Sequence, residues 1–320
     1  DYTIYTPQLK SDDGRPLRVN PRLGNFTYEF SPHVLARLGL HAVSFCFFIL
    51  WDGYLTGRLN RRGIWLKKEL SISGSGIINL SDRQCFDRKF FAEEPLSVVR
   101  DRQALFSRYG LEASYWLLRD LKKDFRPTPS QPVAVQVTYD SARERLVKTP
   151  VSLERLQALL VENSNGHVHI NKPLYYYETD LEKYLQTTCP DTGALFPGDC
   201  DLLLYDDAHV CQFILEFKKT TSRDSTPMKD QSFLNYIHKD RNKYTRLNIL
   251  RNCLSQTDGR TIPFVTVFYS VRAGQEDQVK LERIGPSLGL ERSALFSIGP
   301  DPEANQELLL RQVLALCGDP

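Results

Sequence analysis

The chain contains 320 residues, of which 41% are hydrophobic and 25% charged, and its formal net charge is +2. The composition is that of a globular protein, and the length is sufficient for two domains. The nearly balanced charge excludes a uniformly basic chain, so a basic surface for a nucleic acid would have to be local.

The cysteines and the apolar runs indicate where the protein resides. Seven cysteines are scattered through the sequence and none forms a C-x-x-C pair, so we expect reduced thiols rather than a zinc or iron–sulphur site. The opening residues show no secretory signal pattern. The longest apolar run, residues 42–51, is about half of the roughly 20 residues that a membrane-spanning helix needs. We therefore expect a cytoplasmic protein with no membrane partner.

Residues 1–130 are expected to form an N-terminal α+β lobe for substrate recognition or regulation. A short helix near residues 33–40 and the buried run precede residues 51–68, where five cations are interleaved with two tryptophans and a tyrosine. Arg61 and Arg62 are candidate contacts for nucleic-acid phosphates, with bases stacked on the aromatic rings. A solvated loop whose aromatic side chains belong to the core explains the pattern equally well.

The next segments lead to the expected domain boundary. Apolar spacing over residues 96–125 predicts an amphipathic helix in two parts, interrupted near Gly110. Three prolines within residues 126–132 disfavour both a helix and an inner strand. We place the boundary near residue 130.

A hairpin and a helix follow this boundary. Alternating valines at residues 133–137 predict a strand with a hairpin partner at residues 143–147. Ser152 is expected to cap a helix over residues 153–162 that stops at Asn165 and Gly166. The sequence leaves open whether these elements belong to the first lobe or to the second domain, residues 131–320.

The second domain has a recognisable order of elements. A helix over residues 174–187 carries Glu178 and Glu182 on one face, although Glu182 also fits a capping box with a purely structural role. Two strands, a helix over residues 232–254 and a strand over residues 263–270 come next. This order predicts a right-handed crossover and parallel pairing. Strands at 278–284 and 294–298 and a helix at 303–316 would extend the sheet and cover one face.

The two strands of this domain carry charges in an apolar setting. Asp201 opens the first strand, and after a polar hairpin the second strand carries Glu216 and Lys218. Because side chains alternate along a strand, Glu216 and Lys218 point to the same face and Phe217 points to the other. Buried charges must be paired, neutralised or bound to a metal. A divalent ion on Asp201 and Glu216 would satisfy them, whereas on an exposed edge the same residues would form an ion pair without chemistry.

This constellation resembles the signature of the PD-(D/E)xK nuclease superfamily over roughly residues 170–300. The resemblance implies a restriction-endonuclease-like αβββαβ core, a mixed sheet flanked by helices, within an α/β chain of mixed α+β character. It implies that Asp201 and Glu216 bind Mg²⁺ or Mn²⁺ with the backbone carbonyl of Phe217. Lys218 would orient or deprotonate the attacking water.

Some positions depart from the family pattern or have alternatives. Pro197 is followed by Gly198 rather than by an aspartate, so Asp199 is a rival to Asp201 as the metal ligand. Glu178 or Glu182 would supply an outer carboxylate. His167 and His169 are either upstream nitrogen ligands or bystanders, and the second is the more common case.

A basic stretch after the two strands is the predicted nucleic-acid surface. Gln231 and Tyr236 resemble a Gln and a Tyr found in phage-exonuclease-like members, although their spacing is one residue longer here. A cationic flank beside the cluster would hold a phosphate backbone over the metal. Its candidate residues are Lys219, Lys239, Arg241, Lys243, Arg246 and Arg251.

These observations predict a metal-dependent nuclease, an endonuclease that cuts DNA in preference to RNA, with Mg²⁺ or Mn²⁺ as cofactor. One alternative is a non-catalytic module of the same fold that binds a nucleic acid or a partner without metal. Another is an effector nuclease that stays inactive until a partner engages the first lobe. A homodimer or a partner protein is expected by analogy, because cutting two strands needs two sites.

Overall fold

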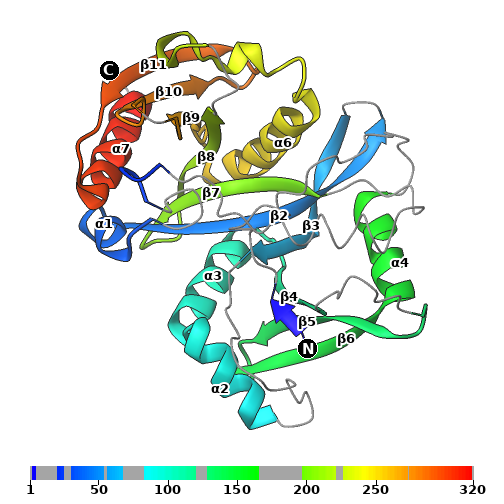
Figure 1. Ribbon diagram of the computed structural model, residues 1–320. Helices are drawn as coiled ribbons and strands as arrows, with labels where there is room; N and C mark the ends of the chain where they lie inside the picture. The colour runs from blue at the N-terminus through cyan, green and yellow to red at the C-terminus, as the bar shows by residue number, and fades with distance from the viewer. Residues whose placement is uncertain are drawn as a thin grey trace. The chain divides into compact units, whose positions relative to one another are not determined.

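The computed structural model describes residues 2–4, 20–24, 30–53, 56–67, 83–119, 128–165, 197–220, 226–272 and 274–318. The fold is mixed α+β, as predicted (Figure 1). The chain divides into two compact units. Unit 1 comprises Asp1–Leu9 and Phe45–Gly198, and unit 2 comprises Lys10–Ser44 and Asp199–Pro320.

Unit 1 contains a mixed sheet and three helices among its described residues. Residues 45–53 of strand β2 (Leu40–Gly53) belong to unit 1, where β2 lies beside β3 (Thr56–Lys67). The other elements are β1 (Tyr2–Ile4), α2 (Arg83–Glu93), α3 (Leu96–Arg108), β4 (Ala113–Arg119), β5 (Pro132–Asp140), β6 (Arg145–Ser152) and α4 (Leu153–Ser164). Strand β3 pairs in parallel with β4, and β4 pairs antiparallel with β5 and with β1.

The predicted helix over residues 96–125 is correct only in its first part. Helix α3 ends at Arg108, Gly110 adopts a φ of 64°, and residues 113–119 form β4. The aromatic side chains of Tyr115 and Trp116 are buried in the sheet, and such residues are favoured on a packed strand. The second part of the predicted helix is therefore wrong.

The hairpin and the capped helix after residue 130 are confirmed, and both lie in unit 1. Strands β5 and β6 pair antiparallel over residues 132–152. The Ser152 hydroxyl accepts a hydrogen bond from the Arg155 N–H at 3.2 Å, and Asn165 ends α4 in the left-handed conformation with a φ of 58°. Because β5 also pairs with β4, the division between the units does not coincide with the expected boundary near residue 130.

The described elements of unit 2 are α1 (Pro32–Arg37), β7 (Gly198–Asp206), β8 (Cys211–Thr220), the 3₁₀ turns η1 (Met228–Asp230) and η2 (Phe233–Asn235), α6 (Arg241–Asp258), β9 (Phe264–Ser270), β10 (Gln278–Ile284), β11 (Leu290–Ser297) and α7 (Pro302–Cys317). Neighbouring strands follow the order β11-β10-β9-β8-β7. Strands β8 and β9 are parallel, as the predicted crossover requires, and the other pairs of neighbours in this series are antiparallel.

The two faces of this sheet have different chemistry. One face packs against α1 and α7, and its core includes Leu215, Val267 and Leu309, with Phe217 at its edge. The other face carries Glu216 and Lys218, and α6 covers it through contacts such as that of Tyr244 with Phe264. Helices α6 and α7 lie on different sides of β8 and β9 (Figure 1). The alternation predicted for residues 216–218 is thus confirmed.

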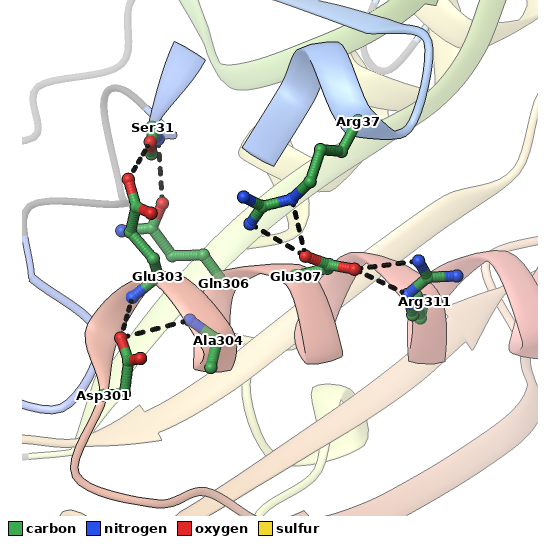
Figure 2. A network of polar contacts seen from close by, with 8 residues as sticks. All are labelled: Ser31, Arg37, Asp301, Glu303, Ala304, Gln306, Glu307 and Arg311. Atoms are coloured by element: carbon green, nitrogen blue, oxygen red, sulfur yellow. Dashed lines mark hydrogen bonds and ion pairs between the residues drawn. The ribbon is translucent and has the colours of Figure 1, made fainter. Parts of the chain in front are cut away.

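Helix α7 also anchors the N-terminal segment of unit 2 (Figure 2). Asp301 caps the helix by accepting hydrogen bonds from the N–H groups of Glu303 and Ala304. The Ser31 N–H donates to Gln306 Oε1 at 2.8 Å, and Arg37 donates to Glu307 at 2.9 Å. An early segment of the chain that includes Ser31 and Arg37 therefore belongs to the same unit as α7.

The predicted helix over residues 232–254 begins later than expected. Residues 233–235 form a 3₁₀ turn, and the α-helix starts at Arg241. The Ser232 hydroxyl accepts from the Leu234 N–H, and the Phe233 N–H donates to the buried Glu282 carboxylate at 2.6 Å. The N–H groups of Phe233 and Leu234 therefore donate to side chains, and such side-chain bonds compete with the backbone bonds of an α-helix.

Other expectations fall outside the described residues. The predicted helix over 174–187, with Glu178 and Glu182, and the histidines His167 and His169 all lie within residues 166–196, which the structure does not describe. Among the helices it does describe, none has the length and apolar character to cross a membrane.

Candidate functional site

Two adjacent strands bring Asp201 and Glu216 together. The ladder between β7 and β8 runs from the Tyr205–Cys211 pair to the Leu202–Leu215 pair. One residue further on, the Asp201 side chain accepts a hydrogen bond from the Phe217 N–H at 2.8 Å. This bond holds the Asp201 carboxylate against the strand that carries Glu216. The structure therefore brings Asp201, which lies within β7, next to Glu216 on β8.

Lys243 joins the two carboxylates. Its Nζ lies 2.6 Å from Glu216 Oε1 and 3.9 Å from Asp201 Oδ1. Lys243 lies in the first turn of α6, the helix that covers this face. Lys243 was predicted from the sequence to contact a nucleic acid, whereas in the structure its ammonium lies near both candidate metal ligands.

Lys218 is a second lysine beside Glu216. Its Nζ is 3.5 Å from Glu216 Oε1 and 3.0 Å from Asp240 Oδ2. It also lies 5.5 Å and 5.4 Å from the ring centroids of Tyr236 and Tyr244, within the range of a cation–π contact. We call Asp201, Glu216, Lys218, Asp240 and Lys243 the carboxylate–lysine cluster.

Glu216 is the most constrained member of the cluster. Its side chain is completely buried, and Oε2 has no hydrogen-bond donor among the described residues. Burial, and then the negative charge of Asp201, raise the pKa of Glu216 to about 7, while Lys243 and Lys218 oppose this shift. The carboxyl group is therefore one that an additional cation would stabilise in its charged form.

The donor set suits a hard divalent cation. Both carboxylates point to one position, which the Lys243 ammonium shares, and they offer oxygen ligands. Within the described part of the chain, no group of three or more His, Cys, Asp or Glu side chains could hold a metal ion. Mg²⁺ is commonly held by one or two carboxylates, waters and substrate phosphates. Asp201 and Glu216 fit that mode of binding.

Asp199 and Phe217 are the other predicted metal ligands that the structure describes. Asp199 lies on β7 two residues before Asp201 and is partly buried. Phe217 contributes its N–H to Asp201, and the role of its carbonyl stays a prediction. The contacts of Asp201 with Phe217 and Lys243 favour Asp201 over Asp199 as the ligand.

A second buried ion pair lies on β10, and sequence reasoning missed it. Lys280 Nζ is 2.9 Å from Glu282 Oε1, and both residues are buried. Glu282 pairs with Thr266 in the sheet, and Thr266 pairs with Glu216. Lys280 also donates to the carbonyls of Lys229 and Gln231. The sequence indicates this pair only by its spacing. Lys280 and Glu282 are two residues apart, as Glu216 and Lys218 are, so both side chains of each pair point to the same face of their strand.

The segment held by this pair carries Gln231 and Tyr236. Gln231 is buried, donates to the Thr226 carbonyl at 3.1 Å and accepts from the Tyr236 hydroxyl at 2.9 Å. Both residues precede α6 rather than lying on it. Tyr236 is thereby positioned with its ring beside Lys218.

The predicted basic surface is only partly exposed. Lys219, Lys239 and Arg241 are exposed, as a phosphate contact requires. Arg246 is partly buried, and burial lowers its pKa to about 10. Arg251 is completely buried and donates to the carbonyls of Ile284 and Gly285, so its assignment to a surface is wrong.

In unit 1, the two arginines predicted to contact phosphates are exposed but the second tryptophan is not. Arg61 and Arg62 are exposed on β3. Arg61 donates to the Tyr109 carbonyl at 3.3 Å, and Arg62 lies 3.5 Å from Glu112. Trp65 is 2% exposed and packs on Trp116 at 4.3 Å. Of the two interpretations of this segment, the core interpretation holds for Trp65.

Comparison of the chain with protein-family models, with curated proteins and with solved structures finds no match. The resemblance to the nuclease superfamily therefore rests on Asp201, Glu216 and Lys218 and on the order of the elements around them.

Proposed function

We propose that the protein is a metal-dependent phosphodiesterase of the PD-(D/E)xK type, an endonuclease that cuts DNA. The observation that supports this proposal best is the convergence of Asp201 and Glu216 on one cation position, with Lys218 beside them. Burial raises the pKa of Glu216, and buried carboxylates with raised pKa values of this kind gather at functional sites.

Asp201 and Glu216 would hold the ion. When bound, Mg²⁺ or Mn²⁺ neutralises charge on the scissile phosphate and lowers the pKa of a coordinated water. Asp201 keeps its orientation because the Phe217 N–H donates to it. The rigid strand pair thus presents two carboxylates in a fixed geometry, which favours the charge distribution of the transition state.

Lys218 is the residue that would act on the attacking water. Asp240, Glu216 and two aromatic rings hold its ammonium in place. From there it would orient the water and stabilise the negative charge that develops as the new P–O bond forms and the ester bond breaks. Lys219, Lys239 and Arg241 are exposed on the same unit and would contact the phosphate backbone.

The test is cleavage of supercoiled plasmid, labelled single-stranded DNA and RNA with Mg²⁺, Mn²⁺ or EDTA. We expect metal-dependent cutting of DNA by the wild type and a loss of at least about 100-fold in Lys218→Met, given the usual size of such contributions. Lys229→Met is the matched control, because Lys229 is an exposed lysine of the same unit. Absence of cutting of every substrate by the folded wild type would refute the proposal.

One observation favours a second candidate. The Lys243 ammonium lies 2.6 Å from Glu216, so the buried carboxylate has a counter-charge without any metal. This is what a non-catalytic nucleic-acid or partner-binding module on the same fold requires. Such a module would retain DNA in EDTA and in Asp201→Asn, and it would cut nothing.

A further inference from the structure

The position of Lys243 is unusual for a lysine. It lies in the first turn of α6, which contains no acidic residue. Cations are disfavoured there by the partial positive charge of the helix N-terminus. The N-cap residue Asp240 makes no capping hydrogen bond and instead pairs with Lys218. The attraction of Asp201 and Glu216 therefore holds the Lys243 ammonium in an otherwise unfavourable place.

The same position is the one where a divalent ion would bind. Lys243 Nζ lies within 4 Å of an oxygen of each candidate ligand, and a divalent ion needs the same oxygens at about 2.0–2.6 Å. Two cations cannot both occupy that space, because their charges repel strongly at such short distances. Glu216 is fully buried, but Lys243 retains 28% of its side-chain exposure, so its flexible stem has a path towards solvent.

We propose that Lys243 is a tethered cation that occupies the metal position, so that divalent-ion binding and the Lys243 ion pairs exclude each other. This inference rests on the proposed function. It assigns Lys243 a role in regulating metal occupancy rather than in binding the nucleic acid alone. In the absence of metal, Lys243 neutralises the buried carboxylates. Once a divalent ion binds, the ammonium moves to solvent, where a substrate phosphate can meet it.

The first experiment measures metal binding without any substrate. Mn²⁺ binding is followed by electron paramagnetic resonance or calorimetry at one fixed pH in the wild type, in Lys243→Met and in Lys229→Met. We expect at least tenfold tighter binding in Lys243→Met, because the competing cation is gone. The Lys229→Met control removes the same charge from an exposed position and should bind as the wild type does.

The outcomes separate this inference from the proposed function. Equal or weaker binding in folded Lys243→Met, with binding to the wild type abolished by Asp201→Asn, overturns the inference and leaves the metal-dependent function standing. Absence of Mn²⁺ binding in both wild type and Lys243→Met overturns the inference and the metal-dependent function together.

A second measurement uses only the wild type and so does not depend on the folding of a variant. Acylation of individual lysines is followed by mass spectrometry with and without saturating Mn²⁺. We expect labelling of Lys243 to rise severalfold when metal binds, with the exposed Lys229 as an internal reference. Unchanged labelling of Lys243 at saturating metal would show that the ammonium stays in place and would overturn the inference.

Discussion

At the scale of single residues, Glu216 determines the chemistry of the site. It is fully buried, lies beside a second carboxylate and depends on two lysines for its counter-charge. Removing an ionised carboxylate from water is costly unless ion pairs compensate for it. The raised pKa of Glu216 shows that burial and Asp201 outweigh the lysines. The free protein therefore loses stability when Glu216 ionises.

This predicts a pH dependence of stability in EDTA. The folded-state pKa of Glu216 is about 7 and its ordinary value is 4.5, so the folded state binds the proton more tightly. The contribution of Glu216 is fully present below about pH 4.5 and is lost as the pH rises through about 7. We expect the free energy of unfolding to fall by on the order of 2–3 kcal/mol across this window.

Urea unfolding of wild type and Glu216→Gln between pH 4.5 and 8 measures this effect. The variant should lack the fall, because its amide does not titrate. Glu112→Gln, which alters an exposed carboxylate of unit 1, should keep the wild-type profile. If Glu216→Gln retained the full pH dependence, a different group would have to be responsible.

At the scale of elements, residues 228–236 depend on β10 for their structure. The Phe233 N–H donates to Glu282, and the Lys280 ammonium donates to two carbonyls of the segment. The segment in turn places Tyr236 over Lys218. A buried pair on one strand thus positions a ring beside the catalytic candidate on another.

Breaking this pair should loosen the segment. Glu282→Met leaves Lys280 as a buried charge without its carboxylate, and we expect a loss of about 3–5 kcal/mol in unfolding free energy. Amide exchange at Phe233 should accelerate, because its acceptor is removed. Glu291→Gln, which weakens a more exposed pair with Arg283, should cost less than about 1 kcal/mol.

The double variant Lys280→Met/Glu282→Met provides the decisive comparison. With both charges replaced by apolar side chains, most of the lost stability should return, while exchange at Phe233 should stay fast. A double variant no more stable than Glu282→Met would argue that the pair does not act through its charges.

At the scale of the whole molecule, unit 2 combines an early segment of the chain, Lys10–Ser44, with its C-terminal part, Asp199–Pro320. Leu23, Phe30 and Val34 are completely buried and share a core with residues of β9 and α7. The Asn20 side chain donates to the carbonyls of Ser270 and Glu276 at 2.8 Å and 3.1 Å. The early segment is therefore a structural part of the unit that contains the candidate site.

We predict that Phe30→Ala destabilises all of unit 2. Removal of a fully buried phenylalanine side chain costs about 3–5 kcal/mol. Hydrogen exchange should show lower protection in β9 as well as near residue 30. Leu234→Ala, at a side chain with 49% exposure, should change stability by less than about 0.5 kcal/mol. Loss of protection confined to residues near Phe30 would contradict a shared core.

Local patterns determined much of the fold of this protein. Alternation placed Glu216 and Lys218 on one face and Phe217 on the other, and the described structure agrees. Ser152 and Asn165 marked the ends of α4 correctly. Strands β8 to β10 and helix α7 lie close to their predicted residues. These features depend on residues that are close together in the chain, so periodicity and capping residues predict them directly.

Only the tertiary structure decided which groups meet. Strand periodicity assigns Glu216 to a face, but the packing of α6 on that face brings Lys243 to it. Residues 113–119 form a strand because β3 and β5 flank them, and Lys280 and Glu282 form a pair that supports a distant segment. Contacts between residues far apart in the chain depend on how helices and strands pack together, so no local sequence pattern predicts them.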